Sequence, residues 1–454
     1  MGRIRKLLLL LAALALFAVA CGDDDETTVG ADMADDSSDD MDDDADDSSD
    51  DMDDDSEMMD HLGDGSLGVV EVESGEAIQI RSLNTITGDV AFLGLPNQRG
   101  VELAVEHYGA IHGFDVTSGE GLDDTCSADG GQAAAQTIVA DDRVVGVIGT
   151  SCSGAAAAAA PLVTSAGMVM ISPSNTSPAL TSDLAGTAGE NYSVGYYRTA
   201  HNDLYQGAAM AQFVYGDLGL ATAAAIHDGD PYTQGLAQAF ADAYEALGGT
   251  VTGFTAVHKD DADMVPVLTE VAAHTPEALF FPIFQPAGDH IAAQAPGVAG
   301  LENTVLLAAD GLLVDSYLEL SQTAGMYFSG PDVRYGDNTN QSTGRTADDF
   351  LADYNNLYGV APEAPFWAHS YDATTLLLEA IEAASFTDGD TLVVDRQGVR
   401  DYLNSVSGYS GLIGSISCDD FGDCGAQRIT VIHHEDPDDL AASKANVVFE
   451  YAPS

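Results

Sequence analysis

The residues best suited to chemistry are the small polar residues of the turn Gly149-Thr150-Ser151-Cys152-Ser153-Gly154. The apolar run 144–148 before it predicts a buried strand, and the alanine-rich run after it predicts a helix with Pro161 as its first breaker. Free N–H groups at a helix N-terminus attract anions, and Ser153, at the expected N-cap, carries a hydroxyl suited to a carboxylate. A purely structural cap is the alternative.

Two other chemistries do not fit this turn. A Gly-x-Ser-x-Gly nucleophile elbow needs glycine where Ser153 stands. The Gly-Lys-Ser/Thr of a phosphate-binding loop is missing from the turn. The sequence contains no paired metal ligands and no nucleotide-binding loop, so we expect neither a metal nor a cofactor.

Five cysteines fit an oxidising compartment. If Cys21 carries lipid, four are left, and four allow three pairings. Cys418 and Cys424 bracket a short hairpin-like loop that a local bridge could close. Cys126 and Cys152 each end a predicted strand, so neighbouring strands would bring them together. Zinc is a weaker alternative, because there is no Cys-x-x-Cys and the histidines are scattered.

The N-terminus predicts a lipoprotein address. Residues 1–20 form a signal peptide, with basic residues at 3, 5 and 6 before an apolar run too short to span a bilayer comfortably. Ala18-Val19-Ala20-Cys21-Gly22 resembles a lipobox, with Ala18 in place of the usual Leu. We therefore expect cleavage before Cys21, diacylation of its thiol, and an extracytoplasmic protein anchored to the cell membrane by lipid. An ordinary secreted protein is the alternative.

Residues 21–76 are predicted to be an acidic, disordered linker that carries the lipid anchor. Residues 23–60 contain no Lys, Arg or aromatic residue, and the ten residues 35–44 recur verbatim at 46–55. Such a segment buries too little apolar surface to offset its chain entropy, and its like charges extend it. Calcium binding is the weaker alternative, because the glycine and the closing Glu of an EF-hand loop are missing.

The charge of the whole chain argues against nucleic acid as a partner. There are 14 Lys and Arg against 74 Asp and Glu, which gives a formal net charge of −60. A chain of this charge is not expected to bind nucleic acid. Such acidity resembles that of proteins from salty habitats, where screening weakens self-repulsion.

Strand and helix patterns alternate from residue 77 onward and begin afresh near Arg198. Repeated strand–helix units predict parallel sheets covered by helices on both faces, and the length allows two such α/β lobes. In folds of this kind ligands bind at the carboxyl ends of strands. The loops selected by that rule fall in both lobes, which predicts a cleft between them; they follow Leu83, Ile148, Ile171, His227, Phe284 and Ala309.

Several motifs occur at these strand ends: Asp124-Thr125-Cys126, Cys152-Ser153, Ile171-Ser172-Pro173 with Thr176, and His227-Asp228 with Tyr232. With them, the chain from about Ala77 onward resembles the leucine/isoleucine/valine-binding proteins, the type I substrate-binding components of ABC importers. The resemblance implies two Rossmann-like lobes of the type I periplasmic-binding fold and a Cys126–Cys152 disulfide. We expect residues 77–198 plus 331–428 in the N-terminal lobe and 199–330 plus 429–454 in the C-terminal lobe. A multi-crossover hinge would join them near Arg198, Gly330 and Gln427.

The resemblance also implies how a free amino acid would be held. Its carboxylate would bind Ser153 and Thr176, and its ammonium would meet the carbonyl of Ser174 and the carboxylate of Asp310, where the family pattern has Glu. The shorter Asp requires a closer ligand or a bridging water. The chemistry is sound on its own terms, because a buried zwitterion needs hydroxyl and amide donors at one end and an acid at the other.

Three further positions carry over by resemblance. Tyr232 matches a tyrosine that closes over the ligand, Phe284 replaces another tyrosine, and Leu93 stands where an aromatic residue lines the side-chain pocket. Each of the expected ligand-binding residues also has a structural alternative: Thr176 as a turn residue, Asp310 as a helix cap, Tyr232 as core.

The expected function is capture of a small amino acid of branched-chain type, or a related amide, by hinge closure. The protein would act as a monomer, deliver its ligand to ABC permease subunits and catalyse no reaction. One alternative is a ligand-sensing receptor domain of the same fold. A weaker one is an amidase-like enzyme using Ser153 or Cys152, which needs a free nucleophile beside a base.

Overall fold

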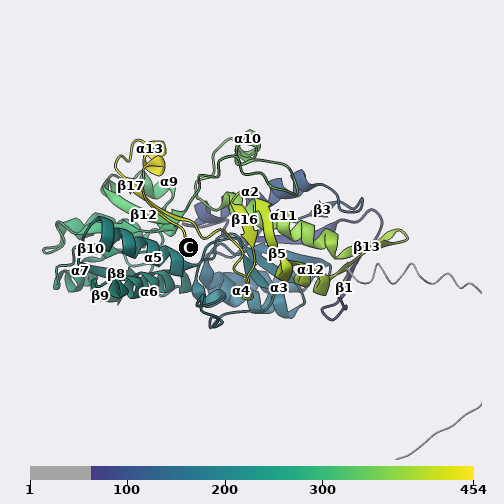
Figure 1. Cartoon of the computed structure of the whole chain (residues 1–454), viewed down its shortest axis with the longest axis horizontal. Helices are drawn as coiled ribbons and strands as arrows, with labels where there is room; N and C mark the ends of the chain where they lie inside the picture. The colour runs from purple at the N-terminus through teal and green to yellow at the C-terminus, as the bar shows by residue number, and fades with distance from the viewer. Residues whose placement is uncertain (1–62, 454) are drawn as a thin grey trace, which may run out of the picture. The chain divides into compact units, whose positions relative to one another are not determined.

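The computed structural model describes residues 63–453. The predicted signal peptide, the predicted lipidation at Cys21 and most of the predicted acidic linker lie outside the described residues. Within residues 63–453, no helix combines the length and the apolar character needed to cross a membrane. The described chain builds two α/β lobes, each around its own sheet (Figure 1).

The first sheet is entirely parallel, as the repeated strand–helix pattern predicts. Its spatial order is β3-β2-β5-β6-β7, and β4 also pairs with β2. The strands are β2 (Ile78–Asn84), β3 (Val116–Thr117), β4 (Leu122–Asp123), β5 (Val144–Gly149), β6 (Val169–Ser172) and β7 (Tyr196–Arg198).

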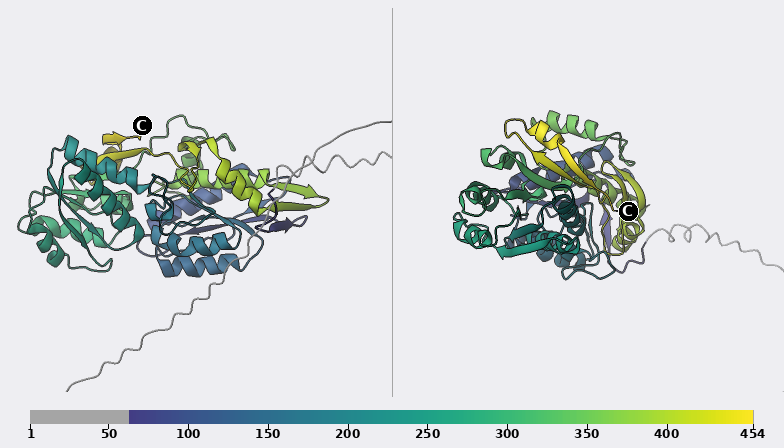
Figure 2. Two further views of the ribbon diagram at one scale, coloured as in Figure 1. Left: turned by 60° about the horizontal axis from the view of Figure 1, so that its bottom comes forward. Right: turned by 60° about the vertical axis from the view of Figure 1, so that its left-hand side comes forward.

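Helices cover both faces of this first sheet (Figure 2). In β6, Val169 and Ile171 pack into one core with α2 (Ala91–Tyr108) and α11 (Trp367–Ala383), whereas Met170 packs on the opposite side. That opposite core contains residues of α3 (Ala128–Val139) and α4 (Ser153–Ser165). A strand with apolar side chains on both faces is buried on both, which explains the continuous apolar runs in the sequence.

The second sheet has the order β18-β17-β12-β11-β10-β8-β9 and is parallel from β12 to β9. The last two strands run antiparallel along the edge. The strands are β8 (Thr222–His227), β9 (Thr250–Ala256), β10 (Ala278–Phe280), β11 (Val305–Ala308), β12 (Met326–Pro331), β17 (Ile429–His434) and β18 (Val447–Tyr451). The two-lobed, mostly parallel α/β architecture predicted from the sequence is therefore confirmed.

Two helices cover one face of the second sheet and two the other. The cores contain α5 (Asp203–Gln212) and α6 (Pro231–Ala246) on one side, and α7 (Val265–Ala272) and α8 (Ala287–Gln294) on the other. Shorter elements complete the lobes: η2 (Pro178–Leu180), η3 (Phe213–Asp217), η4 (Ala295–Gly297), η5 (Asp310–Leu312), η6 (Ser321–Thr323), α9 (Asp315–Leu318) and α13 (Leu440–Ala445).

The folded region begins before residue 77, where the sequence analysis ended the linker. β1 (Val69–Val72) pairs antiparallel with β14 (Thr391–Asp395), and Val70 and Val72 are buried. These valines add a strand to the first lobe, which their acidic surroundings in the sequence conceal. The first lobe also contains α10 (Ala347–Tyr358), β13 (Ser385–Asp388), α12 (Arg396–Ser405), β15 (Ser407–Gly411) and β16 (Gly414–Ser417).

The chain passes between the two sheets three times, after β7, after β12 and before β17. The first and third passages lie against each other at Arg198, whose backbone exchanges hydrogen bonds with Gly422 and Cys424. Its fully buried guanidinium pairs with Asp423 and donates to the carbonyl of Ser177 at 2.8 Å. The Cys418–Cys424 disulfide closes the loop that carries Asp423, which confirms the predicted local bridge.

The buried Arg198–Asp423 pair predicts a large effect on stability. Arg198→Met should lower the free energy of unfolding by about 3–5 kcal/mol, because it leaves a buried carboxylate without its partner. Chemical denaturation measures this loss. Replacing both residues, Arg198→Met with Asp423→Leu, should cost less than the single change. The control Arg143→Met removes an exposed ion pair with Asp141 and should cost under about 1 kcal/mol. A loss as small as the control's would contradict the assignment.

Candidate functional site

Loops from both lobes meet in one small cavity at the carboxyl ends of the parallel strands. It brings together six of the seven predicted ligand-binding residues; its lining is Leu93, Ser151, Cys152, Ser153, Ser174, Tyr232, Phe284, Asp310, Gly311 and Phe366. The cavity is narrow, since only about 10 Å³ is open to the centre of a water molecule. Residues of both lobes line it, so a ligand bound there contacts both lobes.

The turn after β5 presents the N-terminus of α4 to this cavity. Cys152, not Ser153, is the N-cap residue, and it caps without a side-chain hydrogen bond. Its sulfur is bonded to Cys126; this disulfide was implied by the family resemblance and is confirmed. Ser153 is thus the first helical residue, and its Oγ accepts a 3.4 Å hydrogen bond from the Ser177 N–H. The helix also continues through Pro161 to Ser165, past the expected breaker.

Asp124 holds the turn between β5 and α4 in place through hydrogen bonds. Its carboxylate accepts hydrogen bonds from the Ser151 N–H at 2.9 Å, the Cys126 N–H at 2.8 Å and the Thr85 hydroxyl. Burial raises the pKa of Asp124 to about 6, and these hydrogen bonds partly oppose the rise. Asp124 was noticed in the sequence only as part of a motif, and its position identifies it as the residue that fixes the shape of the turn.

Thr176 is the predicted residue that does not line the cavity. It is fully buried, and its carbonyl accepts a 2.9 Å hydrogen bond from the Asp203 N–H at the start of α5. Its hydroxyl faces the Asp203 carboxyl, whose pKa is raised well above its ordinary value by burial first and by the nearby Asp310 second. The contact of Thr176 with a ligand stays a prediction.

Asp310 enters the cavity from the second lobe at the carboxyl end of β11. Its Oδ1 accepts hydrogen bonds from Gln206 Nε2 at 2.7 Å and from the Tyr232 hydroxyl at 3.2 Å. The same hydroxyl accepts a 3.1 Å hydrogen bond from the Gly311 N–H. Oδ2 accepts no side-chain hydrogen bond from the described residues, so this oxygen is available to a ligand. Burial raises the pKa of Asp310 to about 6 against the opposing effect of these donors.

Gln206 connects Asp310 to the crossover between the lobes. Its Nε2 also lies 3.1 Å from both the carbonyl and the hydroxyl of Ser329, so the amide nitrogen faces three acceptors. Its Oε1 therefore faces His201, whose Nε2 must donate the hydrogen bond between them. Burial lowers the pKa of His201 to about 4, so this ring is neutral near pH 7. Gln206 and His201 were missed by the sequence analysis, because a polar residue inside a helical pattern gives no signal of its partner.

The rest of the cavity wall is apolar. The rings of Tyr232 and Phe284 lie 5.2 Å apart, and Leu93 from α2 faces the same space. Phe366, which precedes α11 and stacks on His201, was also missed. Its position just before a helix carries no sequence signal for a pocket. The cavity thus combines a polar end at α4, an acid at Asp310 and an apolar wall.

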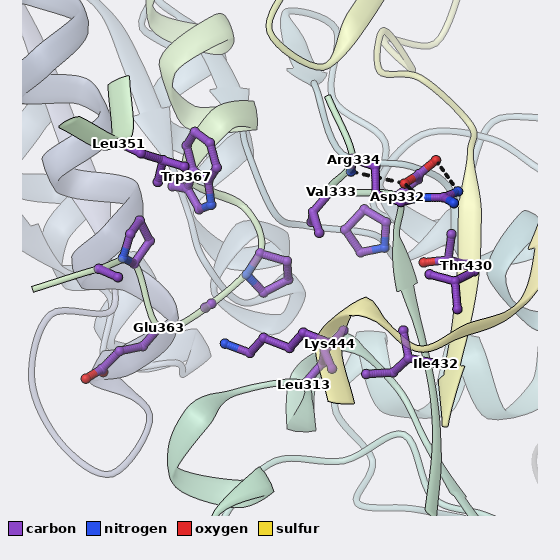
Figure 3. A pocket seen from close by; sticks show the side chains of 16 residues that line it. Leu313, Asp332, Val333, Arg334, Leu351, Glu363, Trp367, Thr430, Ile432 and Lys444 are labelled. Atoms are coloured by element: carbon purple, nitrogen blue, oxygen red, sulfur yellow. Dashed lines mark hydrogen bonds and ion pairs between the residues drawn. The ribbon is translucent and has the colours of Figure 1, made fainter. Parts of the chain in front are cut away.

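A larger cavity of about 300 Å³ lies elsewhere, between the loop before α11 and strands β12 and β17 (Figure 3). Its walls are mostly apolar, with Trp367 and Leu351 facing Leu313 and Ile432. Its two cations are already paired, Lys444 with Asp315 and Arg334 with both Asp332 and Glu450. Convergent polar groups distinguish the smaller cavity, and we therefore assign the candidate site there.

Neither a metal centre nor a thiol nucleophile emerges from the described residues. Residues 63–453 hold no group of three or more His, Cys, Asp or Glu side chains placed to bind a metal ion. Cys152 is engaged in its disulfide, which removes the thiol that an amidase-like reaction would use.

Comparisons with known proteins agree with the two-lobed fold. The chain is 26% identical over 364 residues to the Leu/Ile/Val-binding protein homolog 3 of Brucella melitensis. The aligned region covers 79% of this chain and 92% of that protein. Among solved structures it resembles the leucine-binding protein LivK of Thermotoga maritima, with a TM-score of 0.68, 24% identity and coverage of 83% and 99% of the two chains. The chain also resembles LivJ of Streptococcus pneumoniae, solved with isoleucine, with a TM-score of 0.66 and 21% identity; the match covers 83% of this chain and 99% of LivJ.

Two α/β lobes that share one polar cavity define the class of two-lobed binding proteins. The model of the periplasmic binding protein family matches residues 77–425, more than half of the chain, and the chain belongs to that family. The relative and the two solved structures named above are binding proteins, and the fold predicted from the resemblance is confirmed.

The raised pKa of Asp310 predicts a pH-dependent stability. A carboxyl whose pKa is higher in the folded state stabilises the fold below its unfolded pKa, and this contribution is lost as pH rises through about 6. Relative to Asp310→Asn, the wild type should lose about 2 kcal/mol of unfolding free energy between about pH 4 and pH 8. Denaturation at several pH values measures it, with Asp348→Asn on the exposed face of α10 as the control. A difference that does not vary with pH would contradict the assignment.

Proposed function

We propose that this protein is an extracytoplasmic solute-binding component of an ABC importer. It captures a small amino acid of branched-chain type, or a related amide, between its lobes and delivers it unchanged to membrane permease subunits. A lipid on Cys21 anchors it to the cell membrane, and the acidic linker lets the monomeric folded region reach the permease. The observation that carries the proposal is one cavity lined by Ser153 from one lobe and Asp310 from the other.

The chemistry of the cavity suits a small molecule that carries an ammonium group. Oδ2 of Asp310 and the backbone of Ser174 supply acceptors, and the N-terminus of α4 with Ser153 supplies donors. Leu93, Phe284 and Phe366 supply an apolar wall for a branched side chain. Relatives described as Leu/Ile/Val-binding, and a structural neighbour solved with isoleucine, support this ligand class.

Lobe closure follows from the same contacts. A ligand that touches both lobes stabilises the closed state by its differential affinity for the two states. The chain crosses between the sheets at Arg198, at the end of β12 and before β17, and we expect the backbone to bend at these crossovers. The closed form then docks on the membrane permease.

The proposed carboxylate contacts predict a loss of affinity. The double variant Ser153→Ala with Thr176→Val should bind leucine at least about tenfold more weakly, a difference of about 1.4 kcal/mol, because two hydroxyl donors are removed. Isothermal titration calorimetry measures it. The control Thr137→Val removes an exposed hydroxyl from α3. Unchanged leucine affinity in a folded double variant would refute the contacts.

The proposed ammonium contact predicts a ligand-dependent loss. Asp310→Asn should weaken leucine binding by about 10–100-fold, because a charge-assisted hydrogen bond contributes about 1.5–3 kcal/mol. The deaminated analogue 4-methylpentanoate lacks the ammonium and should lose much less. Competition calorimetry compares the two ligands in both proteins. Equal losses for leucine and its analogue would exclude the pairing.

A further inference from the structure

Asp230 contacts both lobes, at the N-terminal end of α4. It is the N-cap residue of α6 in the second lobe, where its Oδ1 accepts a 2.8 Å hydrogen bond from the Tyr232 N–H. Its other oxygen lies against Gly154 of the first lobe, since a methyl group on Gly154 would come within 2.2 Å of Oδ2. The Gly154 N–H lies close enough to this carboxylate to lower its pKa. Glycine is therefore required at 154 by close approach of the opposite lobe.

A second interlobe contact stands beside the first. The Ser177 hydroxyl of the first lobe donates a 2.9 Å hydrogen bond to the carbonyl of Pro231, the residue after Asp230. Ser177 also donates its N–H to Ser153 Oγ, so this contact reaches the first residue of α4. The position of Asp230 is thus fixed by its own helix, by Gly154 and by the Ser177–Pro231 bond.

Gly154 follows Ser153 in the first turn of α4, where the N–H groups have no helical acceptor. Ser153 is the residue proposed to receive the carboxylate of a ligand. The carboxylate of Asp230 therefore lies against the next residue, Gly154, of the same N-terminal helix end. Two carboxylates on neighbouring N–H groups repel each other, and they share the stabilisation of a single helix dipole.

The charges around Asp230 add to this repulsion. Asp228 from its own loop and Asp124 from beneath the β5 turn both raise its pKa, after burial, and the total effect brings it to about 7. Asp203 at the start of α5 is also within electrostatic reach of it. The guanidinium of Arg198, which acts on Asp203, is held by Asp423. The end of α4 is thus surrounded by acids of this chain.

We propose that Asp230 is a specificity-determining residue that makes the cleft favour ligands with an ammonium group and no free carboxylate, such as α-amino amides, over the zwitterionic amino acid. The inference rests on the proposed function and narrows its ligand class. Asp310 still binds the ammonium of either ligand, whereas the end of α4 receives an uncharged oxygen more readily than an anion. Simple carboxylates without an ammonium are the least favoured ligands.

The test compares L-leucine with L-leucinol, which keeps the ammonium and the side chain but lacks the carboxylate. Calorimetry at about pH 8 keeps Asp230 ionised in the wild type. Asp230→Asn and Asp230→Ser both retain an N-cap for α6 and remove the charge. Each should raise the affinity for leucine relative to leucinol by about tenfold, as expected when one like charge is removed at short range. Asp242→Asn, the same change at an exposed site on α6, should leave the ratio unchanged.

The outcomes separate this inference from the proposed function. If both probes bind and neither variant shifts the ratio, Asp230 does not determine specificity and the proposed function stands. If neither probe binds the wild-type protein, the proposed ligand class is wrong, and this inference with it. Thermal unfolding of each variant shows whether it is folded, and the serine variant provides the measurement if the asparagine variant is not.

Discussion

The cost of placing the Asp310 carboxylate out of water is the constraint that organises the cleft. A buried carboxylate is tolerated only where donors replace its lost hydration. Gln206 supplies one from α5, and Tyr232 supplies another from α6. Gln206 is fixed in turn by Ser329 on β12 and by His201 in the first crossover. Three elements of the second lobe and one crossover are thus positioned by the need to satisfy one oxygen atom.

The crossover region contains a buried positive charge that likewise needs polar partners to replace its lost hydration. Arg198 is fully buried and is compensated by Asp423 and by the carbonyls of Asn175 and Ser177. Asn202 extends the network, because its side-chain amide donates to Asp423 and its backbone N–H donates to Oε1 of Gln427. Both the cleft and the crossovers therefore rely on buried polar groups whose partners come from distant parts of the chain. Such networks are specific, because removing one member leaves another unsatisfied.

The sequence predicted the architecture and most of the cleft because both follow from local patterns. Apolar runs such as 144–148 identify buried strands, and the rule for strand ends then collects Ser153, Tyr232 and Asp310 into one region. What it could not predict depends on contacts far apart in the chain. β1 is a strand only because β14 lies beside it, and Asp230 is significant only because the opposite lobe brings Gly154 against it. The disulfide of Cys152 likewise depends on a partner, Cys126, that lies 26 residues away in the sequence.

The antiparallel pairing of β1 with β14 has a mechanical consequence. It fastens the beginning of the described chain, at residues 69–72, to a ladder within the first lobe and to nothing in the second. Tension from a lipid anchor at Cys21, as proposed above, would be borne by that ladder and would bypass the three crossovers. The first lobe would then stay fixed relative to the membrane while the second lobe moves. Thermal force on the linker would therefore not separate the two lobes around a bound ligand.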